Sequence, residues 1–328
     1  MPAAPASDSE QSPLTPIAVV GAGAVGCYYG GMLARAGLPV TLIARPAHAD
    51  AINAHGLRLQ AQSFDEHVQV HADTRLEAAQ DARLVLFCVK TRDTETTAAA
   101  LAGILSPKAI VLDLQNGVDN VRRIQAQLAN PVLATVVYVA ASMAGPGHLR
   151  HAGGGSLVVG DSRQADVRPA GVAEASLAGI KAMLESAGIA CKLSANIDGE
   201  LWSKFLINCS FNAVSALGRS RYGRMAANEA MMAVMNRAAQ EVVTVARALG
   251  IEMPATDPLE IVERAGQSMA QATSSTEQDI SAGRPTEIDD LNGYLVRKGR
   301  ELGVDTPVNQ TLHALVKLRE SVRLDEGH

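Results

Sequence analysis

The length, composition and charge of the chain exclude several classes of protein. It has 328 residues, more than one typical hydrophobic core accommodates, so we expect about two domains. Its formal net charge of −5 gives no reason to expect a nucleic acid or an anionic membrane as partner. No apolar run approaches the ~20 residues of a transmembrane helix, and the cysteines and histidines show no spacing typical of a metal site. We therefore expect a cytoplasmic globular protein with reduced thiols, no metal, and no membrane or nucleic-acid partner.

The first sixteen residues, MPAAPASDSEQSPLTP, are rich in Pro, Ala and Ser. They lack the basic start and the apolar stretch of a secretory signal peptide. We expect residues 1–16 to form a flexible leader that takes no part in the fold.

From residue 17 onward, short apolar segments alternate with helical ones. The segment 21–37 begins as a glycine-rich turn and continues as a helix that Gly37 ends. Strands are predicted at IAVV (17–20), PVTLIA (39–44), LVLFCV (84–89), AIVLDL (109–114) and PVLATVVYVAA (131–141). This alternation predicts an α/β fold with a Rossmann-type doubly wound parallel sheet.

The alternation of strands and helices gives way to a different pattern after residue 141. The segment 145–161, GPGHLRHAGGGSLVVGD, contains two turn signals and is interpreted as a hairpin-like appendage. A helix is predicted at 172–188, and nearly everything from about 196 to 323 has helical character. We therefore divide the chain into an α/β domain at 17–195 and an all-helical domain at 196–328.

A glycine-rich run opens the first helix. It directly follows a strand and consists of Gly21, Ala22, Gly23, Ala24, Val25 and Gly26. In a GxGxxG run of this kind, the first glycine makes the tight turn and the second lets the backbone approach a pyrophosphate. The third lets the helix pack closely on the strand. The free N–H groups of the helix N-terminus favour a phosphate there, so this segment predicts a dinucleotide cofactor.

The end of the second strand distinguishes between two cofactors. NAD sites usually carry an acidic residue there, which binds the ribose 2′-hydroxyl. Here the strand ends in LIARP, with Arg45 and no acid. A guanidinium favours a 2′-phosphate, so we predict NADP(H). The alternative is that Arg45 merely points into water.

Polar residues also end two further strands. Lys90 follows the strand at 84–89, and Asn116 with Gly117 follows the strand at 109–114. Ligands of open α/β sheets bind beyond the carboxyl ends of the strands. We expect both side chains to face cofactor and substrate, although each could be an ordinary strand terminator.

The stretch 201–214, LWSKFLINCSFNAV, is apolar except on one side. On a helical wheel Lys204, Asn208 and Asn212 fall within an arc of about 80°. Burying such groups without partners is costly, so they should meet other protein groups or a polar ligand. The alternative is a lysine that reaches the surface and two amides that tie helices together.

A second polar cluster occupies residues 274–293. Pro285 is expected to lead into a new helix with Thr286 as N-cap and Asp289 three residues on. Glu287 would then lie in the first helical turn, where the helix dipole favours its carboxylate. Acidic residues at helix starts are often only caps.

Together these residues resemble the ketopantoate reductase (2-dehydropantoate 2-reductase) family over residues 17–320. The resemblance rests on GAGAVG, Arg45, VK at 89–90, QNG at 115–117, HAGGG at 151–155, LWSKFLINCSFN at 201–212, and SS…QD…GRPTEIDDLNG near the end. It implies NADPH-dependent reduction of ketopantoate on the route to pantothenate, with the two domains closing over a small 2-keto acid.

The resemblance also implies roles for individual residues. Lys204 matches the general acid. Glu287 matches the acid that binds substrate hydroxyls and holds that lysine. The positions that match substrate-binding residues are Asn116, Asn208, Asn212 and Ser275. The cofactor-binding positions, besides the glycine-rich run and Arg45, are Lys90 and Asn116.

The chain departs from the family pattern at one place. Between Ser275 and Gln278 the family commonly has an apolar Met-Leu pair, whereas this chain has Thr276 and Glu277. A carboxylate so close to Ser275 would reshape the pocket or repel a substrate carboxylate, unless it faces solvent. This departure leaves the identity of the keto acid open.

Two competing functions remain open at this point. One is a related NAD(P)-dependent dehydrogenase of the 3-hydroxyacid or glycerol-3-phosphate type, against which the TEIDDLNG element and the preceding serine pair argue. The other is a non-catalytic NADP(H)-binding sensor, which predicts a degraded Lys/Asn/Glu constellation. The Ala-rich helices after residue 226 are compatible with a homodimer or with an intramolecular core.

Overall fold

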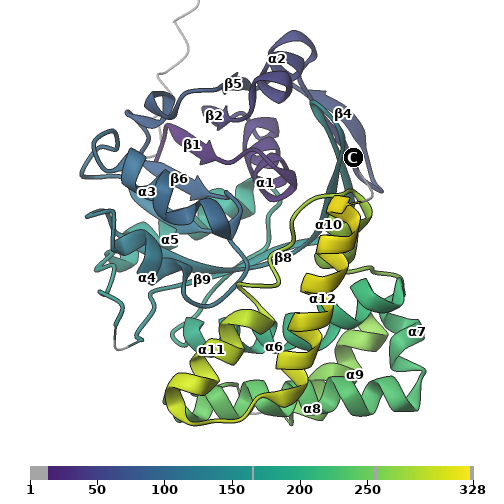
Figure 1. The fold of residues 1–328 in the computed structure, drawn as a ribbon. Coiled ribbons are helices and arrows are strands. Elements are labelled where there is room, and N and C mark those ends of the chain that lie inside the picture. The colour runs from purple at the N-terminus through teal and green to yellow at the C-terminus, as the bar shows by residue number, and fades with distance from the viewer. Residues whose placement is uncertain (1–13, 165, 255–256, 326–328) are drawn as a thin grey trace, which may run out of the picture.

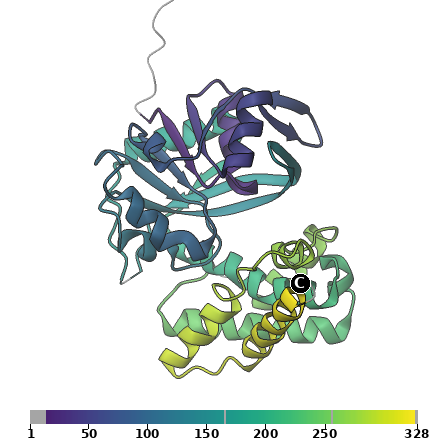
Figure 2. The same cartoon turned by 45° about the horizontal axis from the view of Figure 1, so that its top comes forward.

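The computed structural model of the protein describes residues 14–164, 166–254 and 257–325. Most of the expected leader, residues 1–13, lies outside this part of the chain. The described residues form a sheet flanked by helices and, next to it, a helical part (Figures 1 and 2). No helix among them is both long enough and apolar enough to cross a membrane.

One sheet of ten strands contains every strand of the described residues. Its order is β4-β3-β9-β8-β7-β6-β1-β2-β5, and β10 pairs with β9. The strands are β1 (Ile17–Val20), β2 (Val40–Ile43), β3 (Leu57–Gln60), β4 (Asp65–Val68), β5 (His71–Asp73), β6 (Leu84–Phe87), β7 (Ile110–Asp113), β8 (Val132–Gly145), β9 (His148–Gly160) and β10 (Cys191–Leu193). All pairings from β5 to β8 are parallel.

The central strands are apolar on both faces because helices cover both. On β1, Ile17 and Val19 belong to one cluster of buried side chains. Ala18 and Val20 belong to the other, as the alternation of side chains along a strand requires. The helices around the sheet are α1 (Ala24–Arg35), α2 (Pro46–His55), α3 (Thr94–Leu101), α4 (Asn120–Gln125) and α5 (Glu174–Ser186), with two 3₁₀ turns at Leu76–Ala79 and Thr91–Asp93. The predicted fold class is confirmed.

The segment 145–161 is not an appendage, and that part of the prediction is wrong. β9 pairs antiparallel with β8 and parallel with β3, so it is an internal strand of the sheet. Its last four residues, 157–160, are buried. The first turn signal is a turn at residues 146–147, whereas the second, the glycine run at 153–155, lies inside β9.

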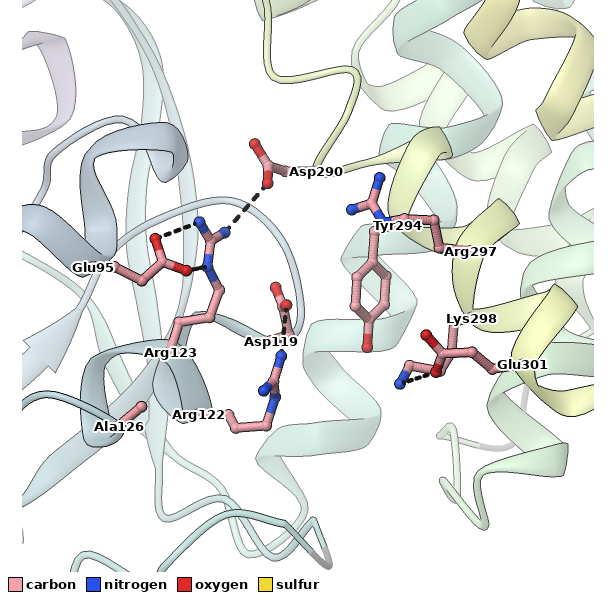
Figure 3. A pocket seen from close by; sticks show the side chains of 10 residues that line it. All are labelled: Glu95, Asp119, Arg122, Arg123, Ala126, Asp290, Tyr294, Arg297, Lys298 and Glu301. Atoms are coloured by element: carbon pink, nitrogen blue, oxygen red, sulfur yellow. Dashed lines mark hydrogen bonds and ion pairs between the residues drawn. The ribbon is translucent and has the colours of Figure 1, made fainter.

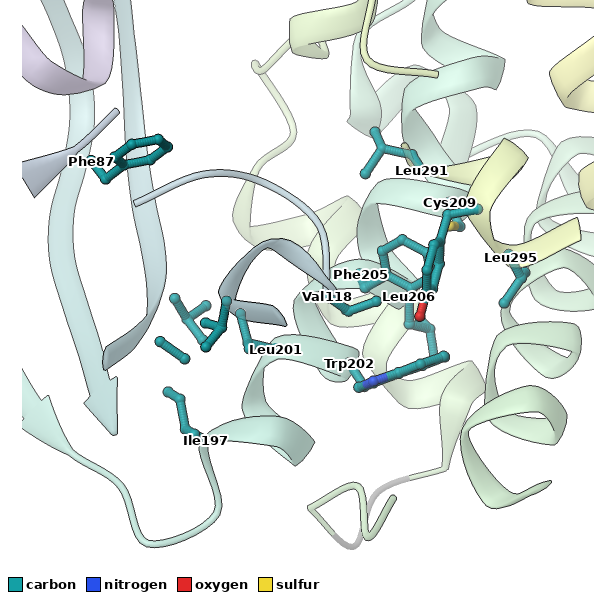
Figure 4. Close-up of a cluster of buried hydrophobic side chains, with 14 of the residues drawn as sticks. Phe87, Val118, Ile197, Leu201, Trp202, Phe205, Leu206, Cys209, Leu291 and Leu295 are labelled. Atoms are coloured by element: carbon teal, nitrogen blue, oxygen red, sulfur yellow. The ribbon is translucent and has the colours of Figure 1, made fainter. Parts of the chain in front are cut away.

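The helical part begins with α6, whose apolar sides anchor it. Trp202 and Phe205 are almost fully buried, and their rings meet edge to face with centroids 5.4 Å apart. Figure 4 shows these side chains among Leu206, Leu291 and Leu295. The helices are α6 (Ile197–Gly218), α7 (Tyr222–Ala226), α8 (Glu229–Ala248), α9 (Pro258–Ser268), α10 (Ser275–Ser281), α11 (Asn292–Leu302) and α12 (Pro307–Asp325). Because α6 also contacts β8 and β9, it links the helical part to the sheet.

Candidate active site

The glycine-rich turn lies between β1 and α1, and its glycines differ in their surroundings. Gly21 has a φ of +95°, and a Cβ there would lie 2.7 Å from the backbone nitrogen of Val89. A Cβ on Gly26 would lie 2.4 Å from the Gly21 carbonyl oxygen and 2.9 Å from Val19 Cγ1. A Cβ on Gly23 would have no described atom within 4 Å. The turn is therefore closed against protein at its first and third glycines and open at the second, as a dinucleotide loop requires.

Arg45 lies at the carboxyl end of β2, the strand next to β1, and its side chain is exposed. It occupies the N-cap position of α2. One turn into that helix, His48 accepts a hydrogen bond from the Gly147 N–H at 2.7 Å, and its Nε2 lies 3.1 Å from Cys27 Sγ on α1. Burial and the charge of Arg45 both lower the pKa of His48. His48 thus links α1, α2 and the β8–β9 turn, a contact that the sequence did not reveal.

Lys90 and Asn116 occupy equivalent places on neighbouring strands. In the parallel register of β6 and β7, Phe87 is paired with Asp113. Lys90 and Asn116 each lie three residues beyond this pair. The structure therefore brings both to one edge of the sheet, where the sequence placed them.

Lys204, in the second turn of α6, reaches that same edge. Its ammonium donates to Asn116 Oδ1 at 3.1 Å and to the carbonyl oxygen of Val137 on β8. It also lies 5.9 Å from the centroid of the Tyr138 ring. Burial lowers the pKa of Lys204 to about 8, although the Glu287 carboxylate opposes that shift. The ammonium is therefore held at the edge of the sheet by two neutral acceptors, and its lowered pKa makes its proton easier to release.

Glu287 lies on the other side of Asn116. Its Oε1 accepts hydrogen bonds from the N–H and hydroxyl of Thr91, at 3.1 and 2.9 Å. Its Oε2 lies 3.4 Å from Lys90 Nζ and 3.5 Å from Asn116 Nδ2. Burial pushes the pKa of Glu287 upward, but Lys90 and these hydrogen bonds outweigh it and hold the pKa below its ordinary value. The carboxylate is therefore ionised at neutral pH.

Lys90 is held by two carboxylates. Besides Glu287, its ammonium lies 3.0 Å from Asp279 Oδ2 on α10, and Arg284 donates to the other oxygen of Asp279 at 2.9 Å. Burial lowers the pKa of Lys90, but Glu287 and Asp279 raise it by more, so the net shift is upward. Lys90 is consequently charged at neutral pH.

The residues Lys90, Asn116, Lys204 and Glu287 form one polar cluster. Three other candidate residues lie outside it. Asn208 is half-buried on α6 and Ser275 is exposed at the first residue of α10; within the described residues neither side chain hydrogen-bonds to the cluster. Asn212 is only 3% exposed, and its Oδ1 accepts a hydrogen bond from the Tyr222 hydroxyl at 3.0 Å. That contact ties α6 to α7, which is the structural alternative considered for these amides.

The expected helix start at Thr286 is wrong. α11 begins at Asn292, and residues 287–291 form a turn in which the Asp290 and Leu291 N–H groups donate to the Glu287 carbonyl. Thr286 forms a turn of its own, because its hydroxyl accepts from the Ile288 N–H at 3.2 Å. Glu287 therefore projects from a turn and not from a helix.

The departure at Thr276 and Glu277 is accommodated locally. Thr276 is buried, and Ser274 caps α10 by accepting from the Glu277 N–H at 3.0 Å. The Glu277 carboxylate accepts from the Ser281 hydroxyl at 2.6 Å, one turn along the same helix. Glu277 thus has a partner within α10.

Some members of the cluster were missed. Thr91 supplies two donors to Glu287, Asp279 holds Lys90, and the Val137 carbonyl accepts from Lys204. Asp279 belongs to the QD pair of the motif near the C-terminus, and Thr91 directly follows Lys90. Their positions in the sequence are therefore a weak indication that they belong to the site. A backbone carbonyl gives none.

Two protein-family models match the chain. The model described as ketopantoate reductase PanE/ApbA matches residues 17–164, and the model of the C-terminal part of the same family matches residues 196–320. A 2-dehydropantoate 2-reductase of Archaeoglobus fulgidus is 32% identical over 305 residues, which cover 93% of this chain and 98% of the relative.

Solved structures give the same result. A PanE/ApbA family ketopantoate reductase from Ralstonia eutropha JMP134 superposes with a TM-score of 0.86 at 46% identity, covering 94% of this chain and 99% of that one. A D-mandelate dehydrogenase solved with NADH and anilino(oxo)acetate has the same TM-score at 23% identity, covering 94% and 98%. The second likeness shows the fold alone.

Proposed function

The chain belongs to the ketopantoate reductase family and is an oxidoreductase, and from this premise we propose that it reduces 2-dehydropantoate (ketopantoate) to pantoate with NADPH. The observation that carries the proposal is the contact of the Lys204 ammonium with Asn116, beside the ionised Glu287, at the carboxyl edge of the sheet. Relatives named 2-dehydropantoate 2-reductase cover nearly the whole chain, which supports this substrate.

The residues present fit a nicotinamide dinucleotide. The turn from Gly21 to Gly26 and the N-terminus of α1 would hold the pyrophosphate, because Gly23 leaves the approach open. Arg45 would bind a ribose 2′-phosphate, which favours NADP(H) over NAD(H). Lys90 and Asn116 would hold the part of the cofactor that reaches the strand ends. When bound, the cofactor supplies the hydride that adds to the keto carbon.

Lys204 supplies the proton. As the keto carbon is reduced, negative charge develops on its oxygen, and a nearby ammonium stabilises that charge. The Lys204 Nζ–H then transfers its proton to this oxygen, which leaves a neutral amine and a hydroxyl group. A pKa of about 8 suits this step, because the ammonium is present at neutral pH yet gives up its proton readily.

Glu287 and Asn116 prepare Lys204 for this step. The negative charge of Glu287 raises the pKa of Lys204 against the effect of burial and so keeps the ammonium charged before the transfer. Asn116 accepts from Lys204 through Oδ1 and faces Glu287 through Nδ2, so one amide fixes both groups. Glu287 also has the chemistry to accept a hydrogen bond from a substrate hydroxyl.

We place the substrate between the sheet and the helical part, with the boundary between the two at residues 195 and 196. Asn208 and Ser275 have polar groups that are free for a ligand among the described residues. Asn212 keeps its amide nitrogen for the substrate while its oxygen binds Tyr222. These three residues are the proposed ligands of the substrate carboxylate and hydroxyl.

Steady-state turnover with a panel of 2-keto acids tests the proposal. We expect NADPH oxidation to be fastest with 2-dehydropantoate and slower with NADH as the reductant. A different preferred keto acid would indicate a related dehydrogenase, and binding of NADPH without turnover of any keto acid would indicate a sensor. As a control for cofactor preference, Arg45→Ala should weaken the binding of NADPH far more than the binding of NADH.

A further inference from the structure

We propose that Arg123 is a positioning residue for Glu287, holding from behind the two segments between which that carboxylate lies. The inference rests on the proposed role of Glu287 and deepens it. Arg123 lies on α4, and its side chain is only 14% exposed. Its described hydrogen-bond partners include neither Lys204 nor the glycine-rich turn.

The Arg123 guanidinium has partners on three segments. It binds the Glu95 carboxylate of α3 in a two-pronged contact, with Nε–Oε1 at 2.6 Å and Nη2–Oε2 at 2.8 Å. Nη2 also donates to the Thr91 carbonyl at 2.9 Å, and Nη1 donates to Asp290 Oδ1 at 3.2 Å. Figure 3 shows Glu95 and Asp290 converging on it from opposite sides. A planar guanidinium is the one side chain that can make all these contacts at once.

Two of these contacts, those with Thr91 and Asp290, lead directly to Glu287. Thr91, whose carbonyl Arg123 holds, binds the Glu287 carboxylate through its N–H and hydroxyl. Asp290, whose carboxylate Arg123 holds, closes the turn of Glu287 by donating its N–H to the Glu287 carbonyl at 3.0 Å. One guanidinium thus fixes both the donors to Glu287 and the turn that carries it.

The turn at 287–290 is also held from the helical part, where Asp289 binds His313 and Lys317 of α12, but these contacts do not reach the Thr91 segment. A hollow of about 360 Å³ opens beside Arg123 between α4 and α11, lined mainly by charged side chains (Figure 3). Arg122 also lines this hollow, but it pairs with Asp119 and Asp166 at 3.3 and 3.4 Å and is 46% exposed. Arg122 is therefore a matched control: it has the same charge on the same helix, and no contact with Thr91 or Asp290 appears among its described partners.

Loss of Arg123 should act through Glu287. Without the guanidinium, the Thr91 segment and the turn at 287–290 lose their common anchor, and the Thr91 donors separate from the carboxylate. The pKa of Glu287 then rises, since those donors favour its ionised form. Turnover should fail at the acidic end of the pH range first, because a protonated Glu287 no longer supports Lys204.

The experiment compares Arg123→Met, Arg123→Lys and Arg122→Met, each alone and combined with Glu287→Gln. We expect Arg123→Met to lower kcat by about 10- to 100-fold, as small misplacements of catalytic groups do, and to move the acidic limb of the pH profile upward. Arg123→Lys, which keeps the charge but not the two-pronged contact, should lose less. Arg122→Met should behave like the wild type.

The combined variants show whether Arg123 acts through Glu287. In the Glu287→Gln background, Arg123→Met should cause no further loss. An equal fold-loss in both backgrounds, or an equal loss from Arg122→Met, would overturn the proposal. If Arg123→Met does not fold, Arg123→Lys provides the same comparison with a smaller loss.

A measurement without turnover separates this inference from the proposed function. Hydrogen exchange of the peptide around residues 90–95 should quicken in Arg123→Met and not in Arg122→Met, because the Thr91 N–H loses its acceptor. Unchanged exchange would refute the positioning role. Wild-type protein that turns over no keto acid would refute the proposed function and leave the exchange result to decide the role of Arg123.

Discussion

Two lysines approach Glu287, one from the sheet and one from the helical part, and their environments are opposite. Lys90 is 44% exposed in its side chain and lies within 3.4 Å of two carboxylates, so its pKa is raised. The Lys204 ammonium binds an amide and a carbonyl and has no carboxylate in direct contact among the described residues, so burial lowers its pKa to about 8.

This contrast suits the two lysines to different roles, Lys90 to keeping its charge and Lys204 to donating a proton. An ammonium between two carboxylates keeps its proton, which suits an electrostatic contact with an anionic ligand. An ammonium held only by neutral acceptors gives its proton up near neutral pH, which suits a general acid. The same glutamate serves both, as a direct partner of Lys90 and as a more distant charge for Lys204.

The largest effect is expected from Lys204→Ala. Removing the proton donor should lower kcat by about 10³-fold, within the range for a general acid, while NADPH affinity stays nearly unchanged. Steady-state kinetics and a binding titration with NADPH measure the two quantities. Turnover close to that of the wild type would refute the general-acid role.

Lys90→Met should give the opposite division between kcat and KM. Its charge is proposed to hold the cofactor, so KM for NADPH should rise by about tenfold, with a smaller fall in kcat. The two variants belong in the same assay. If Lys90→Met abolished kcat with KM unchanged and Lys204→Ala raised only KM, the roles assigned to the two lysines would be reversed.

The pH dependence follows from the lowered pKa of Lys204. Reduction needs the ammonium, which is present below about pH 8 and lost above it. The value of kcat/KM for reduction should therefore fall about tenfold per pH unit above that point, whereas oxidation of the hydroxy acid should speed up as the amine forms. Glu287→Gln removes the charge that raises the pKa of Lys204, so the limb should move to lower pH; a limb that stays in place would contradict the coupling.

The sequence predicted those parts of the molecule that depend on periodicity and on strand ends. The strands from β1 to β8 that it found are strongly apolar, and the equivalence of Lys90 and Asn116 follows from their places after such strands. It missed β3, β4, β5 and β10, because segments such as LRLQ, DEHV, HAD and CKL are short and become strands only by pairing with neighbours.

The site was harder to predict where it depends on tertiary contacts. Thr286 looked like an N-cap, but its hydroxyl makes a local turn and also binds Glu320 on α12, so the helix starts later. The polar stripe of α6 suggested one function for all its members, yet Lys204 meets the sheet while Asn212 meets Tyr222. Helical spacing gives the direction of a side chain but not what lies opposite it.

The smallest expected effect of replacing the two lysines is on the free energy of unfolding, and the two replacements should change it in opposite directions. Below pH 8 the folded protein holds Lys204 charged in a buried place, so Lys204→Met should raise the free energy of unfolding by about 2 kcal/mol. Between pH 8 and 10.5 the unfolded chain binds more protons at this group than the folded one, so the wild type gains stability and the difference shrinks.

Lys90 has a raised pKa, so its contribution is favourable below the unfolded pKa and is lost only as the pH rises through the folded one. Lys90→Met should therefore lower the free energy of unfolding at pH 7, by about 1 kcal/mol since the side chain is partly screened by solvent. Denaturant unfolding of both variants at pH 7 and pH 10 measures this. A lower free energy of unfolding for Lys204→Met at pH 7 would mean that the charged ammonium stabilises the folded protein. The contrast between the two lysines would then not explain which of them gives up a proton.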